Sequence, residues 1–408
     1  MSAGLTAACT VLGALALSVS GAVPAQAAQG APADYQPNSS DIVGVGSDTL
    51  QFILDFGADG DPSGDAGFNT AGNAFKIISL DATADENARF SYLNNSTNAA
   101  LKPQNPTVVI RAQTFPILRP NGSGSGMNAM LADTAITDPT INFVRSSGTV
   151  TGKGFGATAV SHGWQGIQDF VLGHENLGVA AAATTNAPAG LSAKQLVAIY
   201  QCTSTTWTQV GGSSGNTIIP IIPQAGSGTR NTFLADLQAA NGGVAITLGG
   251  CVITSEENDP TAITGASSPA DAIAPFSGSR LNLWSGLSGN TTFGGSPGVG
   301  YFHDPTVAYP GGAALTPGVK MLATTGNASD GTPNYVDNRA LHIAYRWIDQ
   351  ISTTPWQPGG TLNWAQVLFC NPGGAVTPFF QTAEGKLLIA EAGADPSSQS
   401  CLTAPITN

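Results

Sequence analysis

The stretch that decides the fold is IIPQAGSGTRNTFLADL, residues 221–237. It consists of an apolar run, a Gly/Ser turn and a segment of helical character, and the same order occurs in IVGVGSDTLQFILDF, residues 42–56, and in PNGSGSGMNAML, residues 120–131. The start of a helix leaves its first N–H groups unpaired and carries a partial positive charge, and glycine lets a ligand approach the backbone closely. Each turn is therefore a candidate anion site, and their repetition predicts a buried oxyanion.

The candidate ligand-binding residues lie in these turns and in INFVRSSG, residues 141–148, which we expect to be a strand that ends in a polar turn with a cation. Backbone N–H groups, hydroxyls and a guanidinium supply the charge-assisted hydrogen bonds that a buried oxyanion requires. Taken singly, a turn of this kind is more often an ordinary helix cap. The candidates are Ser47, Asp48, Thr49, Ser123, Gly124, Ser125, Arg145, Ser146, Ser147, Ser227, Gly228, Thr229 and Arg230.

The length and charge of the chain restrict its class. With 408 residues it is too long for one ordinary core, so we expect two lobes. Only 10% of the residues are charged, and the net charge is -12 with 14 Lys and Arg. Nucleic acids and anionic membrane surfaces both need a dense basic patch, so neither is expected as a partner. Because the surface does not attract anions, oxyanion binding should depend only weakly on salt.

The amino terminus resembles an export signal. Residues 3–23, AGLTAACTVLGALALSVSGAV, form an apolar stretch, and Ala25-Gln26-Ala27 follows as a small-x-small cleavage pattern. We predict a signal peptide over residues 1–27, a flexible leader over residues 28–40, and a secreted or cell-surface protein. A membrane-spanning helix is the alternative for this apolar length. A lipid anchor at Cys9 is not favoured, because Thr6 stands where a lipobox would have leucine.

Four cysteines remain after cleavage, an even number in an exported chain. Pairing Cys202 with Cys251 and Cys370 with Cys401 closes the shortest loops, and free buried thiols are the alternative. Because the spacing Cys-x-x-Cys does not occur, zinc binding and thiol redox chemistry are not expected.

One segment imitates the start of a calcium loop: Asp59-Gly60-Asp61-Pro62-Ser63-Gly64-Asp65. Its twelfth position is Thr70 instead of the glutamate of an EF-hand, and no helical pattern leads into it. We therefore expect a solvated turn, and neither a metal nor a cofactor is predicted for this protein.

Strand-like and helical segments alternate, which predicts an α/β fold with a largely parallel sheet in each lobe. LSAKQLVAIY, residues 191–200, reads as a helix with Ser192 as its N-cap, and GVAAAATT, residues 178–185, reads as a strand passing between lobes. NRALHIAYRWIDQI, residues 338–351, reads as the last strong helix. In such sheets a ligand lies beyond the carboxyl ends of the strands, where the three turns fall.

The chain resembles the phosphate-binding proteins of ABC transporters, in their actinobacterial style, over nearly the whole mature length. The resemblance rests on the order of six motifs: GVGSDTLQ, RPNGSGSG, INFVRSSG, LSAKQLVAIYQCTSTTW, IIPQAGSGTRNTFL and PADAIAPFS. It implies a two-lobe type II periplasmic-binding-protein fold whose cleft closes on a dehydrated oxyanion. Lobe I would comprise residues 41–178 and 335–408, and lobe II residues 179–334. Phosphate or a similar oxyanion is the implied ligand, an ABC permease is the implied partner, and we expect a monomer.

The resemblance also implies roles for single residues. Asp48 and Thr49 match contacts of the first turn, Ser123 or Ser125 matches a hydroxyl of the second, and Ser227, Gly228 and Thr229 match the third. Two departures stand out. A serine after Arg145 replaces an aspartate that accepts the proton of hydrogen phosphate, and Pro223 or Gln224 replaces an arginine. Arg145, with Arg230 and Arg119 as further candidates, is expected to supply the missing guanidinium, and Asp48 is the expected acceptor of the proton.

Two other function classes remain open at this stage. A secreted oxyanion scavenger or cell-surface binding protein would keep the fold without a transporter. A secreted serine hydrolase is less favoured, because the Gly-x-Ser-x-Gly match at residues 211–215 precedes an apolar run instead of following one. We therefore expect a binding protein and not an enzyme.

Overall fold

The computed structural model describes residues 37–61, 64–82, 107–111, 113–284 and 318–408. The predicted signal peptide and the leader up to residue 36 lie outside these residues. Most of the described strands belong to one ten-stranded sheet with the order β2-β1-β5-β11-β6-β9-β7-β8, and β10 and β12 also pair with β6. The strands of this sheet are β1 (Ile42–Gly46), β2 (Ile77–Ser79), β5 (Phe143–Ser146), β6 (Ile167–Ala182), β7 (Ile219–Pro223), β8 (Ile253–Ser255), β9 (Ala272–Ser277), β10 (Val319–Met321), β11 (Asp337–Arg346) and β12 (Ser400–Cys401).

The helices flank this sheet, and a separate pair of short strands, β3 (Thr107–Val108) and β4 (Ile117–Leu118), lies apart from it. The α-helices are α1 (Gln51–Asp59), α3 (Ser123–Ala132), α4 (Phe155–Ser161), α5 (Ala193–Tyr200), α6 (Gly228–Ala240), α7 (Pro260–Thr264), α8 (Gly278–Trp284), α9 (Trp347–Gln350), α10 (Trp364–Leu368) and α11 (Ala383–Glu391). Short 3₁₀ helices occur at Asp48–Leu50, Trp207–Val210, Pro269–Asp271 and Phe379–Gln381.

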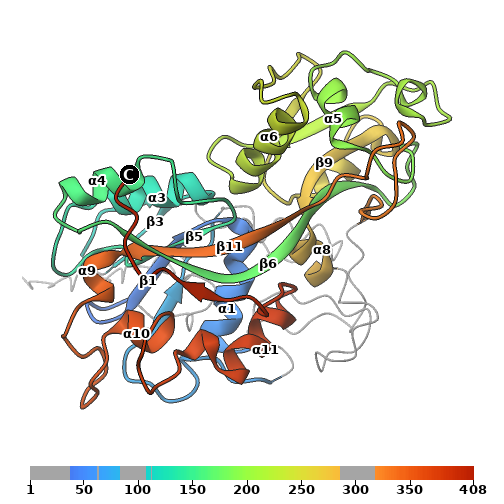
Figure 1. The fold of residues 1–408 in the computed structure, drawn as a ribbon. Coiled ribbons are helices and arrows are strands. Elements are labelled where there is room, and N and C mark those ends of the chain that lie inside the picture. Colours follow the sequence, from blue (N-terminus) through green and yellow to red (C-terminus); the bar gives the residue numbers. More distant parts are fainter. Residues whose placement is uncertain (1–36, 62–63, 83–106, 112, 285–317) are drawn as a thin grey trace, which may run out of the picture.

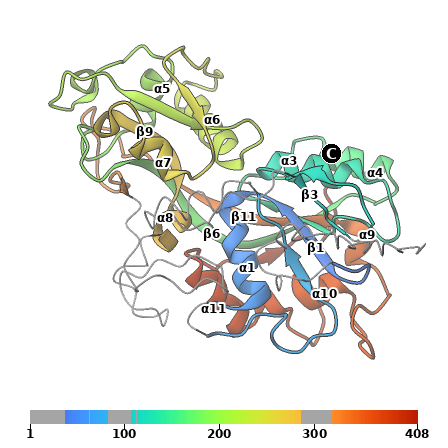
Figure 2. The same ribbon diagram turned by 180° about the vertical axis from the view of Figure 1, so that it is seen from behind.

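The described chain forms two lobes joined by β6 and β11 (Figure 1). The first lobe holds β1 and β5 with α1, α3, α4 and α9 to α11 (Figure 1), and the second holds α5, α6, α7 and β9, as the view from behind shows (Figure 2). Strand β6 has 16 residues and at about 3.3 Å per residue it is long enough, about 50 Å, to serve both lobes. The predicted α/β two-lobe fold is confirmed.

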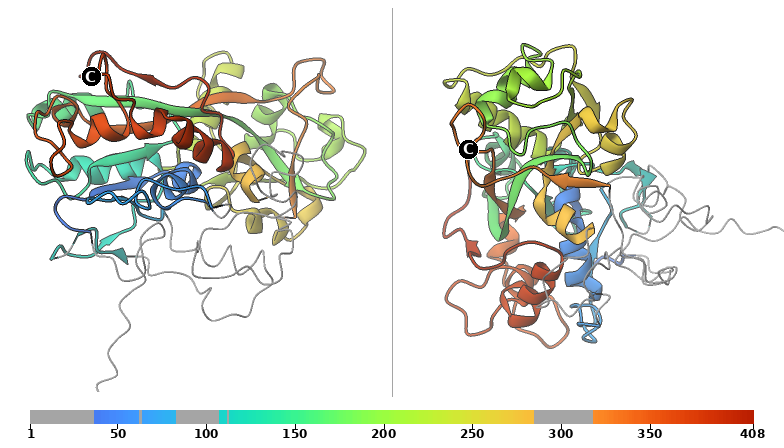
Figure 3. Two further views of the ribbon diagram at one scale, coloured as in Figure 1. Left: turned by 90° about the horizontal axis from the view of Figure 1, so that it is seen from below. Right: turned by 90° about the vertical axis from the view of Figure 1, so that its right-hand side faces the viewer.

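The sheet differs from the expected pair of parallel sheets. Strands β1, β2 and β5 are parallel to one another, as are β7, β8 and β9. Between the two groups, β11 pairs antiparallel with β5, β6 pairs antiparallel with β9, and β6 and β11 pair antiparallel with each other. The two long strands therefore join both lobes into one mixed sheet, and the left view of Figure 3 shows β6, in green, running from one lobe to the other.

The predicted helix at residues 338–351 is wrong. Asp337–Arg346 is strand β11, and only Trp347–Gln350 forms a helix, α9. Leu341, Ile343 and Tyr345 alternate with less apolar residues and are fully buried, which is the period of a strand. The same residues also fit a helical spacing, and pairing with β5 and β6 decides between the two. His342 consequently lies on a strand.

Several local predictions are confirmed. Helix α5 begins after Ser192, whose hydroxyl accepts a hydrogen bond from the Gln195 N–H in a capping box. The first and third strand–turn–helix segments form as expected, as β1 with α1 and β7 with α6. In the second, the helix begins earlier than expected, because α3 already includes the Gly/Ser residues from Ser123 onward.

Both predicted disulfides form, joining Cys202 to Cys251 and Cys370 to Cys401. The first ties α5 to the segment before β8, and the second ties the end of α10 to β12. Each bridge reduces the conformational entropy of the unfolded chain and so stabilises the folded state by about 2–4 kcal/mol.

Candidate functional site

The three predicted turns meet where the lobes touch. The Gly124 N–H, in the first turn of α3, donates to the Gly226 carbonyl before α6 at 3.0 Å. Nearby, Asn121 donates to the Glu256 carboxylate at 2.8 Å and accepts from the Gln224 amide at 2.8 Å. These bonds join the first lobe to the second, so the helix starts of α3 and α6 face each other across the cleft.

Five hydroxyl residues gather beneath this contact, and we call them the Ser/Thr cluster: Ser47, Thr49, Ser123, Ser147 and Thr229. Ser47 donates to the Ser147 hydroxyl at 2.9 Å. The Ser147 N–H donates to the Ser123 hydroxyl at 3.0 Å. Four of the five are at most 1% exposed, and Ser123 is 8% exposed. The sequence-based analysis placed all five in the site, and the structure brings them together.

The carboxylate of Glu257 lies against this cluster. Its Oε1 accepts a hydrogen bond from the Thr229 N–H at 3.2 Å and longer contacts from the hydroxyls of Thr49 at 3.4 Å and Ser147 at 3.5 Å. Its Oε2 is buried without a hydrogen-bond partner. Burial, and next the charge of Asp48, raise the pKa of Glu257. An oxygen of a carboxylate thus already occupies donors that a bound oxyanion would use.

Two buried arginines supply positive charge at the site. Arg339, on β11, donates to the Thr229 hydroxyl at 2.9 Å and pairs with Glu175 of β6 through an Nε–Oε1 bond of 2.9 Å. Arg280, on α8, forms an ion pair of 3.2 Å with Asp48. The sequence-based analysis missed both arginines, Arg339 because its segment was read as a helix.

Asp48 is engaged on both sides. Besides Arg280, it accepts a hydrogen bond from the Asn258 amide at 3.1 Å, and the same amide donates to the Thr49 hydroxyl at 3.1 Å. The Asn258 side-chain oxygen in turn accepts from the Ser277 N–H at 2.9 Å. Asn258 therefore connects the first turn to β9. Its neighbour in the sequence, Glu257, points to the hydroxyls of the Ser/Thr cluster.

The arginines proposed from the sequence have other partners. Arg145 is fully buried and donates to the Ser79 hydroxyl at 2.7 Å and to the carbonyls of Ser47 and Leu80. Arg230 donates to the Pro223 carbonyl, and Arg119 contacts the Asp81 carbonyl. These bonds hold the backbone around β1, β2 and β7 in place, and the one that ends on a residue of the Ser/Thr cluster is accepted by the Ser47 carbonyl and not by its hydroxyl.

The remaining predicted residues lie at the edge of the site. The Ser227 hydroxyl accepts a hydrogen bond from the Arg230 N–H and caps α6. The Ser146 hydroxyl donates to the Gly148 carbonyl at 2.7 Å. Ser125 lies against Gly226, because a Cβ added at that glycine would meet the Ser125 hydroxyl.

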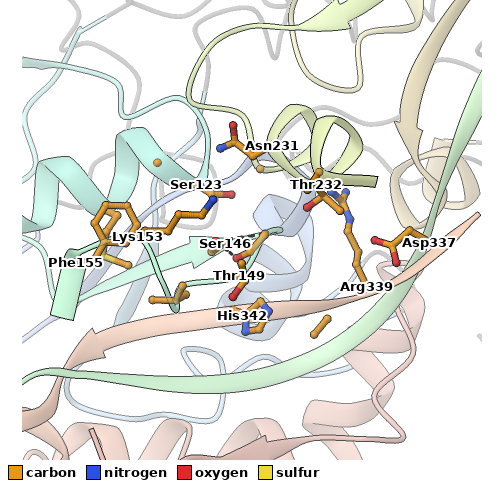
Figure 4. A pocket seen from close by; sticks show the side chains of 17 residues that line it. Ser123, Ser146, Thr149, Lys153, Phe155, Asn231, Thr232, Asp337, Arg339 and His342 are labelled. Atoms are coloured by element: carbon orange, nitrogen blue, oxygen red, sulfur yellow. Dashed lines mark hydrogen bonds between the residues drawn. The ribbon is translucent and has the colours of Figure 1, made fainter. Parts of the chain in front are cut away.

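A cavity of about 290 Å³ adjoins the cluster. Ser123, Gly228 and Arg339 belong to its wall, which also carries Lys153, Asn231 and His342. Figure 4 shows Ser123 of α3 and Lys153 of the segment before α4 on one side of the cavity, Asn231 of α6 on another, and Arg339 and His342 of β11. Ser123 is the residue by which the Ser/Thr cluster borders this cavity.

The sequence offered faint signals for the residues that it did not reveal. Glu257 and Asn258 stand in Glu256-Glu257-Asn258-Asp259, a run of polar residues directly after β8. Arg280 follows β9 in the same manner. Both segments leave parallel strands at the edge of the sheet where ligands bind, so polar residues after each strand were a usable clue.

The family model of the PBP superfamily domain matches residues 60–328, more than half of the chain. The chain belongs to this family. A search of curated proteins gives no match for this PBP-domain chain.

The solved structures that match this chain are distant from it in sequence. A candidate phosphate ABC transporter substrate-binding protein from Clostridium perfringens, with bound phosphate, has 13% identity and a TM-score of 0.47, and the match covers 87% of this chain and 98% of that one. An ABC-type phosphate transport receptor from Vibrio cholerae has 14% identity and a TM-score of 0.44, with 87% and 99% covered. A phosphate-binding protein from Stenotrophomonas maltophilia has 13% identity and a TM-score of 0.36, with 75% and 78% covered. At this distance the similarity does not assign a ligand to this PBP-domain chain.

Within the residues that the structure describes, no helix combines the length and the apolar character that crossing a membrane requires.

Replacing Gly228 by alanine is expected to weaken ligand binding by about tenfold or more, because the new methyl group would stand 2.3 Å from the Ser123 hydroxyl and 2.4 Å from that of Ser147. Calorimetry with phosphate would measure the change. Gly215→Ala is the matched control, since a Cβ there meets nothing within 4 Å. Equal affinities of the two variants would contradict the placement of the site.

Proposed function

We propose that this protein is an exported solute-binding protein that captures phosphate, or a related tetrahedral oxyanion, at the Ser/Thr cluster between its lobes. The observation that carries the proposal is the convergence of three helix starts and five hydroxyl residues on one buried point beside Arg339. A buried divalent oxyanion needs several charge-assisted hydrogen bonds, and helix N-termini, hydroxyls and guanidinium groups are the donors that supply them. Membership of the PBP superfamily and the likeness in sequence motifs to phosphate-binding proteins of ABC transporters support the same ligand class.

The proposal takes residues 41–178 and 335–408 as lobe I and residues 179–334 as lobe II. Strands β6 and β11 support this division, because β6 crosses the boundary at residue 178 and β11 begins just after the boundary at residue 335. Export is supported by the signal-like residues 1–27 and by two disulfides, which persist in oxidising compartments. In transport, the protein would act as a monomer and deliver the bound oxyanion to an ABC permease. A scavenger without a permease would share the same site.

The arrangement favours binding over hydrolysis. The Gly-x-Ser-x-Gly match at residues 211–215 lies in an exposed turn ahead of β7, so it does not form the strand–turn–helix elbow of a serine hydrolase. The five hydroxyls of the Ser/Thr cluster are donors for an anion, and their bonds are made to one another, to Glu257, to Asn258 and to Arg339.

Calorimetry on the chain without residues 1–27 tests the proposal, after unfolding and refolding to remove carried-over ligand. The titrants are phosphate, sulfate, molybdate and phosphonates. We expect one phosphate per chain to bind, with little dependence on salt. The proposal fails if none of these oxyanions binds to a protein whose melting curve shows that it has refolded.

A further inference from the structure

A second polar site lies away from the cleft, at the C-terminal end of α1. Asp61 and Asp65 stand in the loop after this helix, and Glu391 is the last residue of α11. The two helices pack against each other. One carboxylate oxygen of each residue lies within 4.8 Å of one from each of the others. Three acidic groups from opposite ends of the chain therefore converge on one point.

The carboxylates lack the partners that buried charges need. Glu391 is only 1% exposed, and within the described part of the chain no hydrogen-bond donor reaches its buried Oε2 or the buried Oδ2 of Asp61. The Asp61 Oδ1 accepts the Gly64 N–H at 3.0 Å and the Asp65 N–H at 2.8 Å. Among the described residues, the ion pairs with Lys, Arg and His do not include Asp61, Asp65 or Glu391.

Buried carboxylate oxygens without a donor call for a compensating positive charge. A divalent cation among the three carboxylates would neutralise their charges and take the unpaired oxygens as ligands.

We propose that Asp61, Asp65 and Glu391 bind a divalent cation, and that the cation is Ca²⁺. All three donors are carboxylate oxygens, which hard cations prefer. Oxygens on opposite sides of Ca²⁺ are about 4.6–5.2 Å apart, twice the usual metal–ligand distance, so the observed spacing fits one ion held among the three. Mg²⁺ is bound more often by one or two carboxylates with several waters, which fits three converging acidic groups less well.

The bound ion would fasten the loop after α1 to the end of α11. This loop belongs to the segment that imitates a calcium loop, although Thr70 stands at its twelfth position. In the proposed site, Glu391 takes the place of the glutamate that a calcium loop has at its twelfth position, although Glu391 lies more than 300 residues further along the chain. A motif confined to a short stretch of sequence could not include this residue.

Calcium titration tests the site on the chain without residues 1–27, after treatment with a chelator. Calorimetry with Ca²⁺ alone should show one ion per chain, and Ca²⁺ should raise the melting temperature by several degrees. Glu391→Gln and Asp65→Asn should each weaken Ca²⁺ binding by about tenfold or more. Glu384→Gln is the matched control, since Glu384 is an exposed residue of the same helix.

Asp65 lies on the loop and Glu391 on the helix, so the two substitutions disturb different elements. If one variant folds poorly, the other still tests the site. Absence of Ca²⁺ binding to the folded wild-type chain would overturn the proposal. Binding that both variants leave unchanged would do the same. Neither measurement involves phosphate, so the outcome is independent of the function proposed for the cleft.

Discussion

Replacing Glu257 by glutamine is expected to tighten phosphate binding by about tenfold or more. The Glu257 carboxylate takes the Thr229 N–H and approaches the hydroxyls of Thr49 and Ser147, which are donors of the proposed oxyanion site. A bound oxyanion must therefore displace this carboxylate or lie beside it. Two negative charges about 4 Å apart at an effective dielectric constant of about 20 repel each other by about 4 kcal/mol, and tenfold in affinity needs only about 1.4 kcal/mol.

Because the repulsion requires a charged Glu257, phosphate affinity should also depend on pH. Burial and the charge of Asp48 raise the pKa of Glu257, so below that pKa the side chain is neutral and above it the side chain is charged. The neutral form does not repel the ligand, so phosphate affinity should fall as pH rises through the raised pKa of Glu257. The Glu257→Gln protein should lose this part of the dependence, whereas the ionisation of phosphate itself affects both proteins alike.

Calorimetry at several pH values measures both effects, with Glu384→Gln as the control for a change in net charge. If Glu257→Gln binds phosphate more weakly than the wild type, the carboxylate assists the ligand and does not compete with it. That result would reverse the interpretation of Glu257 while leaving the position of the site intact.

Replacing Arg339 by glutamine is expected to weaken phosphate binding by about a hundredfold. Arg339 is the buried guanidinium that donates to the Thr229 hydroxyl, at the start of α6. The variant loses a charge-assisted donor next to the oxyanion, and in a buried site the loss of such a donor costs more than one hydrogen bond between neutral groups. Arg230→Gln should change affinity little, because its guanidinium donates to the Pro223 carbonyl.

The stability of the Arg339 variant needs a separate control. Removing the arginine leaves Glu175 buried without its guanidinium partner, so the single variant should also melt at a lower temperature. The double variant Arg339→Gln with Glu175→Gln removes both charges and should recover part of that loss, yet still bind phosphate weakly. If the double variant binds like the wild type, Arg339 serves the fold and not the ligand.

The sequence by itself determined the local parts of this protein. The order of apolar run, Gly/Ser turn and helix predicted two of the three strand–turn–helix segments closely and the third except for where its helix starts. Ser192 identified the start of α5, and loop length identified both disulfides. The turns and the cap depend on residues close together in the chain, where capping and turn geometry act, and the disulfides followed from the number and spacing of the cysteines. The five hydroxyls of the Ser/Thr cluster were predicted for the same reason, since each lies in or next to a recognisable turn.

Only the tertiary structure decided which charged groups face those hydroxyls. Arg145 satisfied the sequence criterion, but its guanidinium is used by the carbonyls and the Ser79 hydroxyl around β1 and β2. Arg339 was hidden in a segment whose apolar spacing fits a helix and a strand, until pairing with β5 and β6 selected the strand. Glu257 and Glu391 reach their partners across separations of about 110 and 330 residues. Long side chains find their partners through the packing of distant elements, and no local pattern in the sequence records that packing.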